Sequence, residues 1–447
     1  MNHPTRDSGL QSWIDWLLSL HAQEIDMGLE RVSKVASKLK VSRPAPFVMS
    51  VAGTNGKGSS VAMLTSILEA ANYSVGTYTS PHILRYNERI QINGKMVSDQ
   101  AIVDAFLDIE LARGDTKLTY FEFSTLAALL IFKQKKVDVA VLEVGLGGRL
   151  DAVNLVDADA ALICAIDVDH IEWLGSDRSV IATEKAGITR KGKPAVCSDP
   201  NPPKSLFDYA KSRKVPLHFL GMDFHFIQNQ QACQVSQNQA QECSWSVSWN
   251  SEVVDLNWPE LNGKPLPAPA LQGDFQFQNA AGVIALLASV QASLPVSFGA
   301  VCKGLISTQH PGRLQSLFIN EQAWLIDVAH NPQSAKVLAD YLATHSETGY
   351  QAIFSVLNDK DSLPMVTMLK PYVTRWYIAD LGIPRATPLK ALEALLLQAG
   401  VCETSIFFGA SVATSVAEVK TDLPVLVWGS FFTVSQALTA LQNRDWL

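Results

Sequence analysis

A glycine-rich loop between an apolar strand and a helix constrains this chain more than any other feature. The segment Gly-Thr-Asn-Gly-Lys-Gly-Ser-Ser, residues 53–60, follows the apolar run 47–52 and precedes a helical pattern of apolar residues. Glycines permit positive φ, so the N–H groups of such a loop can converge on an anion at the positive end of the helix. The loop predicts a phosphate cradle in which Lys57 neutralises phosphate charge.

The loop is a variant of the common phosphate-binding motif. Val51 stands where the common motif has its first glycine, and Gly58 separates Lys57 from the hydroxyl of Ser59. The alternative is a glycine-rich turn with an exposed lysine. It is disfavoured because strand, glycines, lysine, hydroxyls and helix follow one another in the expected order.

Composition indicates an ordinary soluble globular protein. The chain has 447 residues, 47% of them hydrophobic and 18% charged, which suffices for two or three domains. The net charge of −7, without a concentrated Lys/Arg block, argues against nucleic acid or an anionic membrane as main partner. The chain shows no signal peptide and no apolar run of membrane-spanning length, so we expect a cytoplasmic protein.

The spacing and surroundings of the cysteines also favour a cytoplasmic location. They show no Cys-x-x-Cys spacing, and several lie in apolar runs, so we expect reduced packing residues. They are Cys164, Cys197, Cys233, Cys243, Cys302 and Cys402.

Strand-like and helical patterns alternate along both halves of the chain. Strands are predicted at residues 47–52, 75–79, 137–144, 160–167 and 194–198, and again at 324–329, 352–356, 376–379 and 425–428. Such alternation predicts an α/β fold with parallel-rich sheets covered by helices. The pattern breaks near His310, which divides a P-loop ATPase-type domain (1–309) from a smaller Rossmann-like domain (310–447).

Between the two series, residues 228–241 are rich in glutamine and asparagine and indicate a surface excursion. Trp245, Val247 and Trp249 then alternate as in a half-buried strand. Packing is favoured there over an aromatic binding face.

Polar residues follow several predicted strands and should share one crevice with the loop. Glu143 ends an apolar strand, where a buried carboxylate needs a partner; Mg²⁺ would supply one, and the alternative is an ion pair with an arginine such as Arg149. Ser80 and His170 also follow strands, and a metal-binding or a structural role is equally open for His170.

Other residues are ambiguous by themselves. Lys185 has the position of a surface lysine near a helix end at Gly187. Residues 145–151 offer either flexible backbone beside a metal, with Asp151 as hydrogen-bond acceptor, or a tight structural turn. Residues 121–123 could sandwich a flat ring, although packing is favoured. Residues 327–332 predict a strand end followed by a helix start.

Taken together, these segments resemble the Mur-ligase superfamily and, within it, the family of bifunctional dihydrofolate and folylpolyglutamate synthases. The resemblance covers nearly the whole chain and is specific because its motifs occur jointly and in family order. They are residues 25–32, 53–60, 79–82, 118–123, 143–154, 169–175, 184–188, 311–313 and 327–332.

The resemblance implies an ATP-dependent carboxylate-amine ligase. It would join L-glutamate to dihydropteroate and add γ-linked glutamates to reduced folates, through an acyl phosphate. Mg²⁺, expected as two ions, would be the cofactor and ATP a co-substrate, and we expect a monomer. The alternatives are a single-activity folylpolyglutamate synthase, another Mur-type ligase and, in a different class, a regulatory P-loop ATPase.

The resemblance also assigns roles to residues. Lys57, Glu143, His170 and Lys185, the last as a carboxylated lysine, would form the catalytic set. Ser80, Glu143 and His170 would bind the metal. ATP would be bound by Thr54, Asn55, Gly56, Lys57, Gly58, Ser59, Asn279, Arg313 and Asp327.

The substrate residues follow in the same way. The pterin side would be formed by Ile25, Asp26, Met27, Thr119, Tyr120, Phe121, Glu122, Leu150, Asp151 and Ala152. His330 and Ser430 match positions near the incoming glutamate. This chain departs from near relatives at Asn358 and Phe432, where histidine is common.

Overall fold

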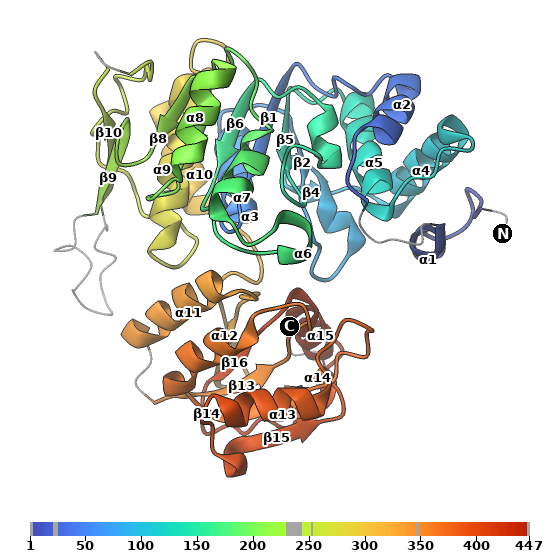
Figure 1. The fold of residues 1–447 in the computed structure, drawn as a ribbon, viewed down its shortest axis with the longest axis vertical. Coiled ribbons are helices and arrows are strands. Elements are labelled where there is room, and N and C mark those ends of the chain that lie inside the picture. The colour runs from blue at the N-terminus through green and yellow to red at the C-terminus, as the bar shows by residue number, and fades with distance from the viewer. Residues whose placement is uncertain (1–2, 21–25, 229–243, 252–253, 346–347, 445–447) are drawn as a thin grey trace. The chain divides into compact units, whose positions relative to one another are not determined.

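The computed structural model describes residues 3–20, 26–228, 244–251, 254–345 and 348–444. It divides the chain into two compact units, each built around its own sheet (Figure 1). The first comprises Met1–His82, Asn87–Ala270 and Gln276–Gln309; the second comprises Ile83–Tyr86, Leu271–Phe275 and His310–Leu447.

The N-terminal unit follows the alternation of strands and helices expected from the sequence. Its elements are α1 (Leu10–Leu20), α2 (Glu30–Leu39), β1 (Phe47–Ala52), α3 (Lys57–Ala70), β2 (Val75–Tyr78), β3 (Ile90–Ile92), β4 (Lys95–Met96), α4 (Asp99–Arg113), α5 (Tyr120–Lys135), β5 (Val139–Glu143), β6 (Ala160–Ile163), α6 (Ile171–Leu174), α7 (Arg178–Ala186), β7 (Ala195–Cys197), α8 (Lys204–Arg213), β8 (Leu217–Phe219), β9 (Phe224–Gln228), β10 (Trp245–Trp249), α9 (Phe275–Ser289) and α10 (Phe298–Ser307).

The main sheet of this unit has the order β4-β3-β2-β5-β1-β6-β7-β8. The strands from β2 to β8 in that order run parallel, while β3 and β4 form an antiparallel edge. Val51 on β1 lies opposite Glu143 on β5 and Leu162 on β6. The loop after β1 is therefore flanked on both sides by carboxyl ends of neighbouring strands, where ligands bind in open α/β sheets.

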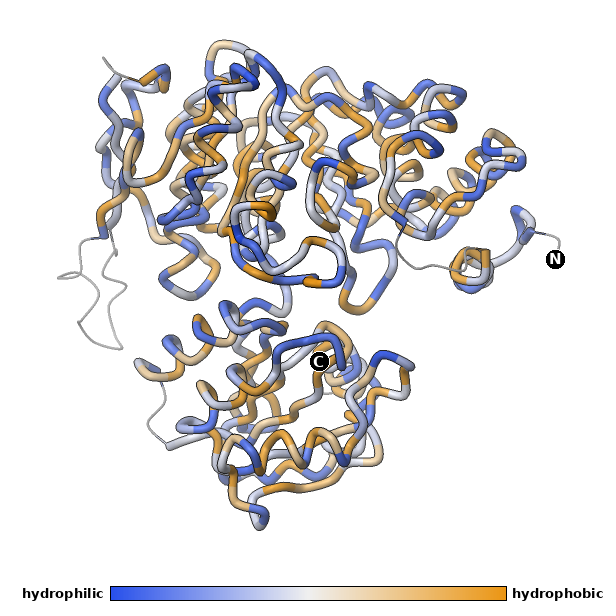
Figure 2. The backbone as a smooth tube through the Cα atoms, in the orientation of Figure 1, coloured by the Kyte–Doolittle hydropathy of each residue, from blue (hydrophilic) through white to orange (hydrophobic). Residues whose placement is uncertain are grey.

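The strands are nearly continuous apolar runs because helices cover both faces of the sheet. In Figure 1, α7 and α8 lie in front of the sheet and α3, α9 and α10 lie behind it. Hydrophobic residues concentrate in the strands and hydrophilic residues in the outer helix faces and loops (Figure 2). The predicted α/β architecture is confirmed.

A two-stranded antiparallel sheet of β9 and β10 follows β8. Trp245, Val247 and Trp249 are all buried, so the expectation that they pack is confirmed. Residues 229–241 of the glutamine-rich segment lie outside the described residues, as does Ile25.

The C-terminal unit repeats the α/β principle on a smaller scale. Its elements are β11 (Gln315–Ile319), β12 (Gln322–Ile326), α11 (Pro332–His345), β13 (Tyr350–Phe354), α12 (Ser362–Leu369), β14 (Val373–Ala379), α13 (Leu389–Gln398), β15 (Ile406–Gly409), α14 (Val412–Glu418), β16 (Val425–Trp428) and α15 (Phe431–Gln442).

The C-terminal sheet has the order β11-β12-β16-β13-β14-β15, parallel except for the β11–β12 hairpin. Phe354, Trp376 and Trp428 form an aromatic cluster in its core. Because β12, β16 and β13 are neighbours, the residues that follow these strands meet at one edge.

The described cysteines are free, but they differ in exposure. Cys164 and Cys197 are buried as expected, whereas Cys402 is exposed, so the packing interpretation is wrong for that residue. Cys233 and Cys243 lie outside the described residues. Among the residues described, no helix has both the length and the hydropathy needed to cross a membrane.

Candidate active site

The loop after β1 closes over the start of α3. Gly56 adopts φ 89° there, and a Cβ at this position would lie 2.5 Å from Oδ1 of Asn279. Glycine is therefore required both for the backbone conformation and for the close approach of α9. Nζ of Lys57 donates to the carbonyl oxygens of Gly53 and Thr54, at 3.0 and 3.1 Å, so the ammonium lies folded over the loop.

The other side of the loop is tied to the segment after β6. The hydroxyl of Thr54 donates to the carbonyl of Asp167 at 2.7 Å and accepts from its N–H at 2.9 Å. Asn55 forms an isolated bridge with Ala165. These contacts with the backbone that follows β6 fix the conformation of the loop.

A hydrogen-bonded glutamine behind the loop was missed by the sequence analysis. Nε2 of Gln276 donates to Oγ of Ser59 at 3.3 Å, and its Oε1 accepts from Nδ2 of Asn279 at 3.0 Å. Gln276 is fully buried and Asn279 nearly so. The spacing of Gln276 and Asn279 was the available signal, because residues three positions apart lie on one face of a helix, and the helix continues with apolar residues and glycine from Ala280 to Ala288.

Glu143 is buried at the end of β5, as predicted. Its Oε2 accepts from the backbone N–H of Ser80 at 3.2 Å, so these two predicted metal ligands are adjacent. Arg149 instead pairs with Glu184, at 2.8 Å. The arginine named in the alternative thus has a carboxylate partner other than Glu143.

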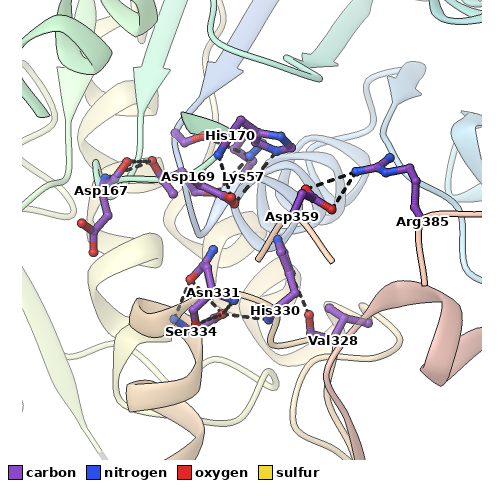
Figure 3. A network of polar contacts seen from close by, with 12 residues as sticks. Lys57, Asp167, Asp169, His170, Val328, His330, Asn331, Ser334, Asp359 and Arg385 are labelled. Atoms are coloured by element: carbon purple, nitrogen blue, oxygen red, sulfur yellow. Dashed lines mark hydrogen bonds and ion pairs between the residues drawn. The ribbon is translucent and has the colours of Figure 1, made fainter. Parts of the chain in front are cut away.

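His170 lies on the opposite side of the loop, at the start of α6. It adopts φ 53°, and its N–H donates to Oδ1 of Asp169 at 2.8 Å (Figure 3). Its Nε2 lies 3.9 Å from Oδ2 of the same carboxylate, and its side chain remains 36% exposed. The imidazole is thus held beside a carboxylate while staying accessible.

Lys185 corrects the interpretation drawn from its local sequence. It is in the last turn of α7, as expected for a helix ending before Gly187, but only 3% of it is exposed. Gly148 packs so closely that a Cβ there would lie 2.9 Å from Cα of Lys185. Burial, reinforced by the charge of Lys57 and opposed by that of Asp169, lowers the pKa of Lys185 to about 7.

These donors fit a hard divalent cation that takes few of its ligands from the protein. Within the described ranges, no three or more His, Cys, Asp or Glu side chains are grouped to hold a metal. Mg²⁺ is commonly bound by one or two protein carboxylates together with water and substrate phosphates. Glu143 and Ser80, with His170 across the loop, suit that mode.

The segments that the resemblance assigns to the pterin side converge in the N-terminal unit. The ring of Phe121 lies 2.6 Å from the place a Cβ of Gly145 would occupy. Cε of Met27 lies 3.5 Å from the corresponding place at Gly147. Segments separated by about a hundred residues of sequence therefore pack on the same glycine loop.

Asp151 shapes that loop. Its Oδ2 accepts from the N–H of Leu146 at 2.8 Å and its Oδ1 accepts from that of Val153 at 2.9 Å. Asp151, which stands between Leu150 and Ala152 in the sequence, is buried, and burial raises its pKa to about 6. The expected acceptor role is confirmed, and the segment is a tight turn.

Thr119 and Glu122 engage each other at the start of α5. The hydroxyl of Thr119 accepts from the N–H of Glu122 at 3.2 Å, and Oε2 of Glu122 accepts from the N–H of Thr119 at 2.7 Å. This is a capping box. Phe123 is buried in packing, whereas Tyr120 and Phe121 are only partly buried.

In the C-terminal unit, Asp327 follows β12 and is buried. Its Oδ2 accepts from the N–H of Leu314 at 2.8 Å and its Oδ1 accepts from that of Ala329 at 2.7 Å. Burial raises its pKa, and the nearby charge of Arg313 opposes that shift. The guanidinium of Arg313 also lies 5.4 Å from the ring centroid of Phe431.

His330 and Ser430 are likewise held by local contacts. Nδ1 of His330 lies 2.8 Å from the carbonyl of Val328, as Figure 3 shows. Ser430 is the N-cap of α15, accepting from the N–H of Thr433 at 3.0 Å. Asn358 follows β13 and donates its N–H to Arg385, and Phe432 is 43% exposed.

Comparison with known proteins places these features in a family. Residues 51–287 match the Mur ligase middle domain. The chain is 40% identical to the dihydrofolate synthase/folylpolyglutamate synthase of Escherichia coli K12, over 99% of this chain and 97% of that protein. The Haemophilus influenzae protein of the same name is 37% identical, over 96% and 97% of the two chains.

Solved structures agree. E. coli FolC in complex with DHPP and ADP has a TM-score of 0.85 at 39% identity, covering 99% of this chain and 100% of that one. A bifunctional folylpolyglutamate synthase/dihydrofolate synthase with Mn, AMPPNP and L-glutamate bound has a TM-score of 0.85 at 38% identity, with the same coverage. With a phosphate-type loop, a buried strand-end carboxylate and this likeness along its whole length, the chain belongs to the dihydrofolate synthase/folylpolyglutamate synthase family of ATP-dependent Mur-type ligases.

Proposed function

We propose that this chain joins L-glutamate to dihydropteroate and adds γ-linked glutamates to reduced folates, at the carboxyl edge of the N-terminal sheet. One observation carries the proposal most directly. The Lys57 loop and the buried Glu143 end adjacent strands, so a phosphate and its counter-ion would meet at one edge. The relatives that bind ADP, AMPPNP and L-glutamate support the same reaction class.

The reaction has two steps. A carboxylate oxygen of the folate substrate attacks the γ-phosphorus of ATP, forming an acyl phosphate and releasing ADP. The glutamate amine then attacks the acyl carbon, phosphate leaves with the former carboxylate oxygen, and the amine loses a proton. Lys57 would offset the repulsion of the two anions in the first step, together with loop N–H groups.

The nucleotide site would consist of residues from the loop and from more distant segments. The loop would bind phosphates, and Gln276 would support Asn279 and Ser59 from behind. The proposed ATP-binding residues are Thr54, Asn55, Gly56, Lys57, Gly58, Ser59, Asn279, Arg313 and Asp327.

Ser80, Glu143 and His170 would hold Mg²⁺, for which we propose two ions. When bound, the metal would supply positive charge to the phosphates. Lys185 would be carboxylated by CO₂, which turns its side chain into an anion at this edge. Its burial and lowered pKa favour this role, because only the unprotonated amine attacks CO₂.

On the substrate side, Asp26, Met27, Phe121 and the turn at 150–152 would contact dihydropteroate. His330 and Ser430 would lie near the incoming glutamate. We further propose a cytoplasmic monomer.

The test offers purified protein ATP, Mg²⁺ and L-glutamate with dihydropteroate in one tube and tetrahydrofolate in another, with products identified by mass spectrometry. Amide product in both tubes is expected. Product in one tube alone would narrow the enzyme to that activity. ATP hydrolysis without amide in either would favour another acceptor or a regulatory ATPase.

A further inference from the structure

Arg31 joins two of the segments that converge on the glycine loop. It lies in the first turn of α2, and its Nη1 is 2.7 Å from Oδ2 of Asp26. Its Nη2 also donates to the backbone carbonyl of Asp26. The guanidinium therefore fixes both the side chain and the main chain of the residue that precedes Met27.

The same guanidinium reaches the start of α5. Its Nε donates to Oε2 of Glu122 at 3.0 Å. That oxygen also accepts from the N–H of Thr119, and Glu122 is only 3% exposed. The carboxylate is thus engaged by the helix cap and by Arg31, which makes Glu122 a link between elements more than a group presented to a ligand.

We propose that Arg31 is a positioning residue for dihydropteroate, which it sets by fixing the Asp26–Met27 segment against the start of α5. The inference rests on the proposed function, because it takes these segments as the dihydropteroate site. Met27 contacts the glycine loop at Gly147, and Phe121 contacts it at Gly145. A shift of Asp26 relative to α5 would therefore move one wall of the site against another.

A purely structural ion pair is the competing explanation. The Arg31 side chain is 25% exposed and that of Asp26 is 34% exposed, so this pair is screened and adds little to stability. The Glu122 side chain is only 4% exposed, so loss of Arg31 also costs stability through that second pair, and the two explanations are separated by the KM of each substrate. The guanidinium bridges two carboxylates on different segments, which favours positioning. A lysine offers one point charge on a flexible stem in place of a planar fork, so it would not hold the two carboxylates in the same fixed geometry.

The test measures KM for dihydropteroate, KM for ATP and kcat in the full-length protein carrying Arg31→Met, Arg31→Lys or Glu122→Gln. Glu122→Gln keeps an oxygen acceptor for the helix cap but removes the charge that faces Arg31. The control is Arg6→Met, because Arg6 pairs with Asp104 at 2.8 Å, and neither residue belongs to the segments that Arg31 joins. KM does not depend on the fraction of active protein, so partial misfolding does not imitate the effect.

Arg31→Met should raise KM for dihydropteroate about tenfold or more, with KM for ATP within about twofold of wild type. Arg31→Lys should be intermediate, and Arg6→Met should change neither constant. An unchanged KM for dihydropteroate in Arg31→Lys and Arg31→Met would overturn the proposal, as would a parallel rise in both constants. Wild-type protein that makes no product from dihydropteroate would instead contradict the proposed function, which separates the two failures.

Discussion

The carboxyl edges of the two sheets use their polar residues differently. At the N-terminal edge, Lys185 is a buried amine with a lowered pKa, and Lys57 donates to carbonyl oxygens of its own loop. At the C-terminal edge, Asp327 accepts two backbone N–H groups, and Ser430 caps a helix. Lys57 and Lys185 would hold charge for the proposed anionic ligand, whereas Asp327 and Ser430 shape the loops around them.

This difference predicts that substitutions at the two edges affect different properties, namely catalytic activity at the N-terminal edge and stability at the C-terminal edge. Removing a charge from the N-terminal edge should impair catalysis while leaving the fold intact, because few structural hydrogen bonds depend on that charge. Removing a polar group from the C-terminal edge should cost stability first, since a backbone donor loses its partner. The following variants test the contrast, beginning with the largest effect.

Lys57→Met should lower kcat/KM for ligation about 10³-fold, because phosphate charge would lose its counter-charge during transfer. The free energy of unfolding should change by less than about 1 kcal/mol, measured by urea denaturation. Lys193→Met is the control, since Lys193 makes a surface pair with Asp159 at 3.1 Å. Near wild-type turnover by Lys57→Met would exclude Lys57 as the counter-charge to the phosphates.

Glu143→Gln keeps the shape of the side chain and its acceptor for the N–H of Ser80, but removes the charge. The Mg²⁺ concentration for half-maximal rate should rise about tenfold or more, since Mg²⁺ prefers anionic oxygen. Glu110→Gln, which alters a pair with Arg113 on α4, should leave the titration unchanged. Superimposable Mg²⁺ curves for Glu143→Gln and wild type would exclude Glu143 as a ligand.

Lys185 should carry a carbamate whose occupancy rises with pH at fixed dissolved CO₂. With a pKa of about 7, the unprotonated amine grows from about a tenth of molecules at pH 6 to about nine tenths at pH 8. Carbon-13 NMR with labelled bicarbonate measures the adduct, and Lys185→Arg should lack the signal and lose about tenfold in kcat. No signal at pH 8, with full activity in Lys185→Arg, would contradict carboxylation.

The smallest contrast compares two helix caps. Ser430 and Ser411 cap α15 and α14 in the same way, each accepting the N–H of a threonine three residues later. Alanine at either position should cost about 1 kcal/mol of unfolding free energy. Only Ser430→Ala should also raise KM for glutamate, by a few-fold; equal kinetic effects of the two variants would mean that Ser430 acts through the fold alone.

Periodicity and strand-end polarity predicted the sheets, the loop between β1 and α3 and the strand-end positions of Glu143 and Asp327, because parallel strands fix which residues share an edge. The burial of Lys185 could not be predicted from these sequence patterns. A lysine in a last helical turn is usually solvated, whereas here Gly148, more than thirty residues earlier, packs against the backbone of Lys185. The contacts of Arg31 with Asp26 and Glu122 likewise depend on tertiary packing that local pattern does not encode.

In the proposed reaction, the γ-phosphate is transferred to the folate carboxylate at the N-terminal edge. Dihydropteroate labelled with oxygen-18 at both carboxylate oxygens tests it, with ATP, Mg²⁺ and L-glutamate, and with phosphate examined by mass spectrometry. The released phosphate should carry one labelled oxygen for each dihydrofolate formed. Unlabelled phosphate accompanying amide product would contradict the acyl phosphate and the role given to this edge.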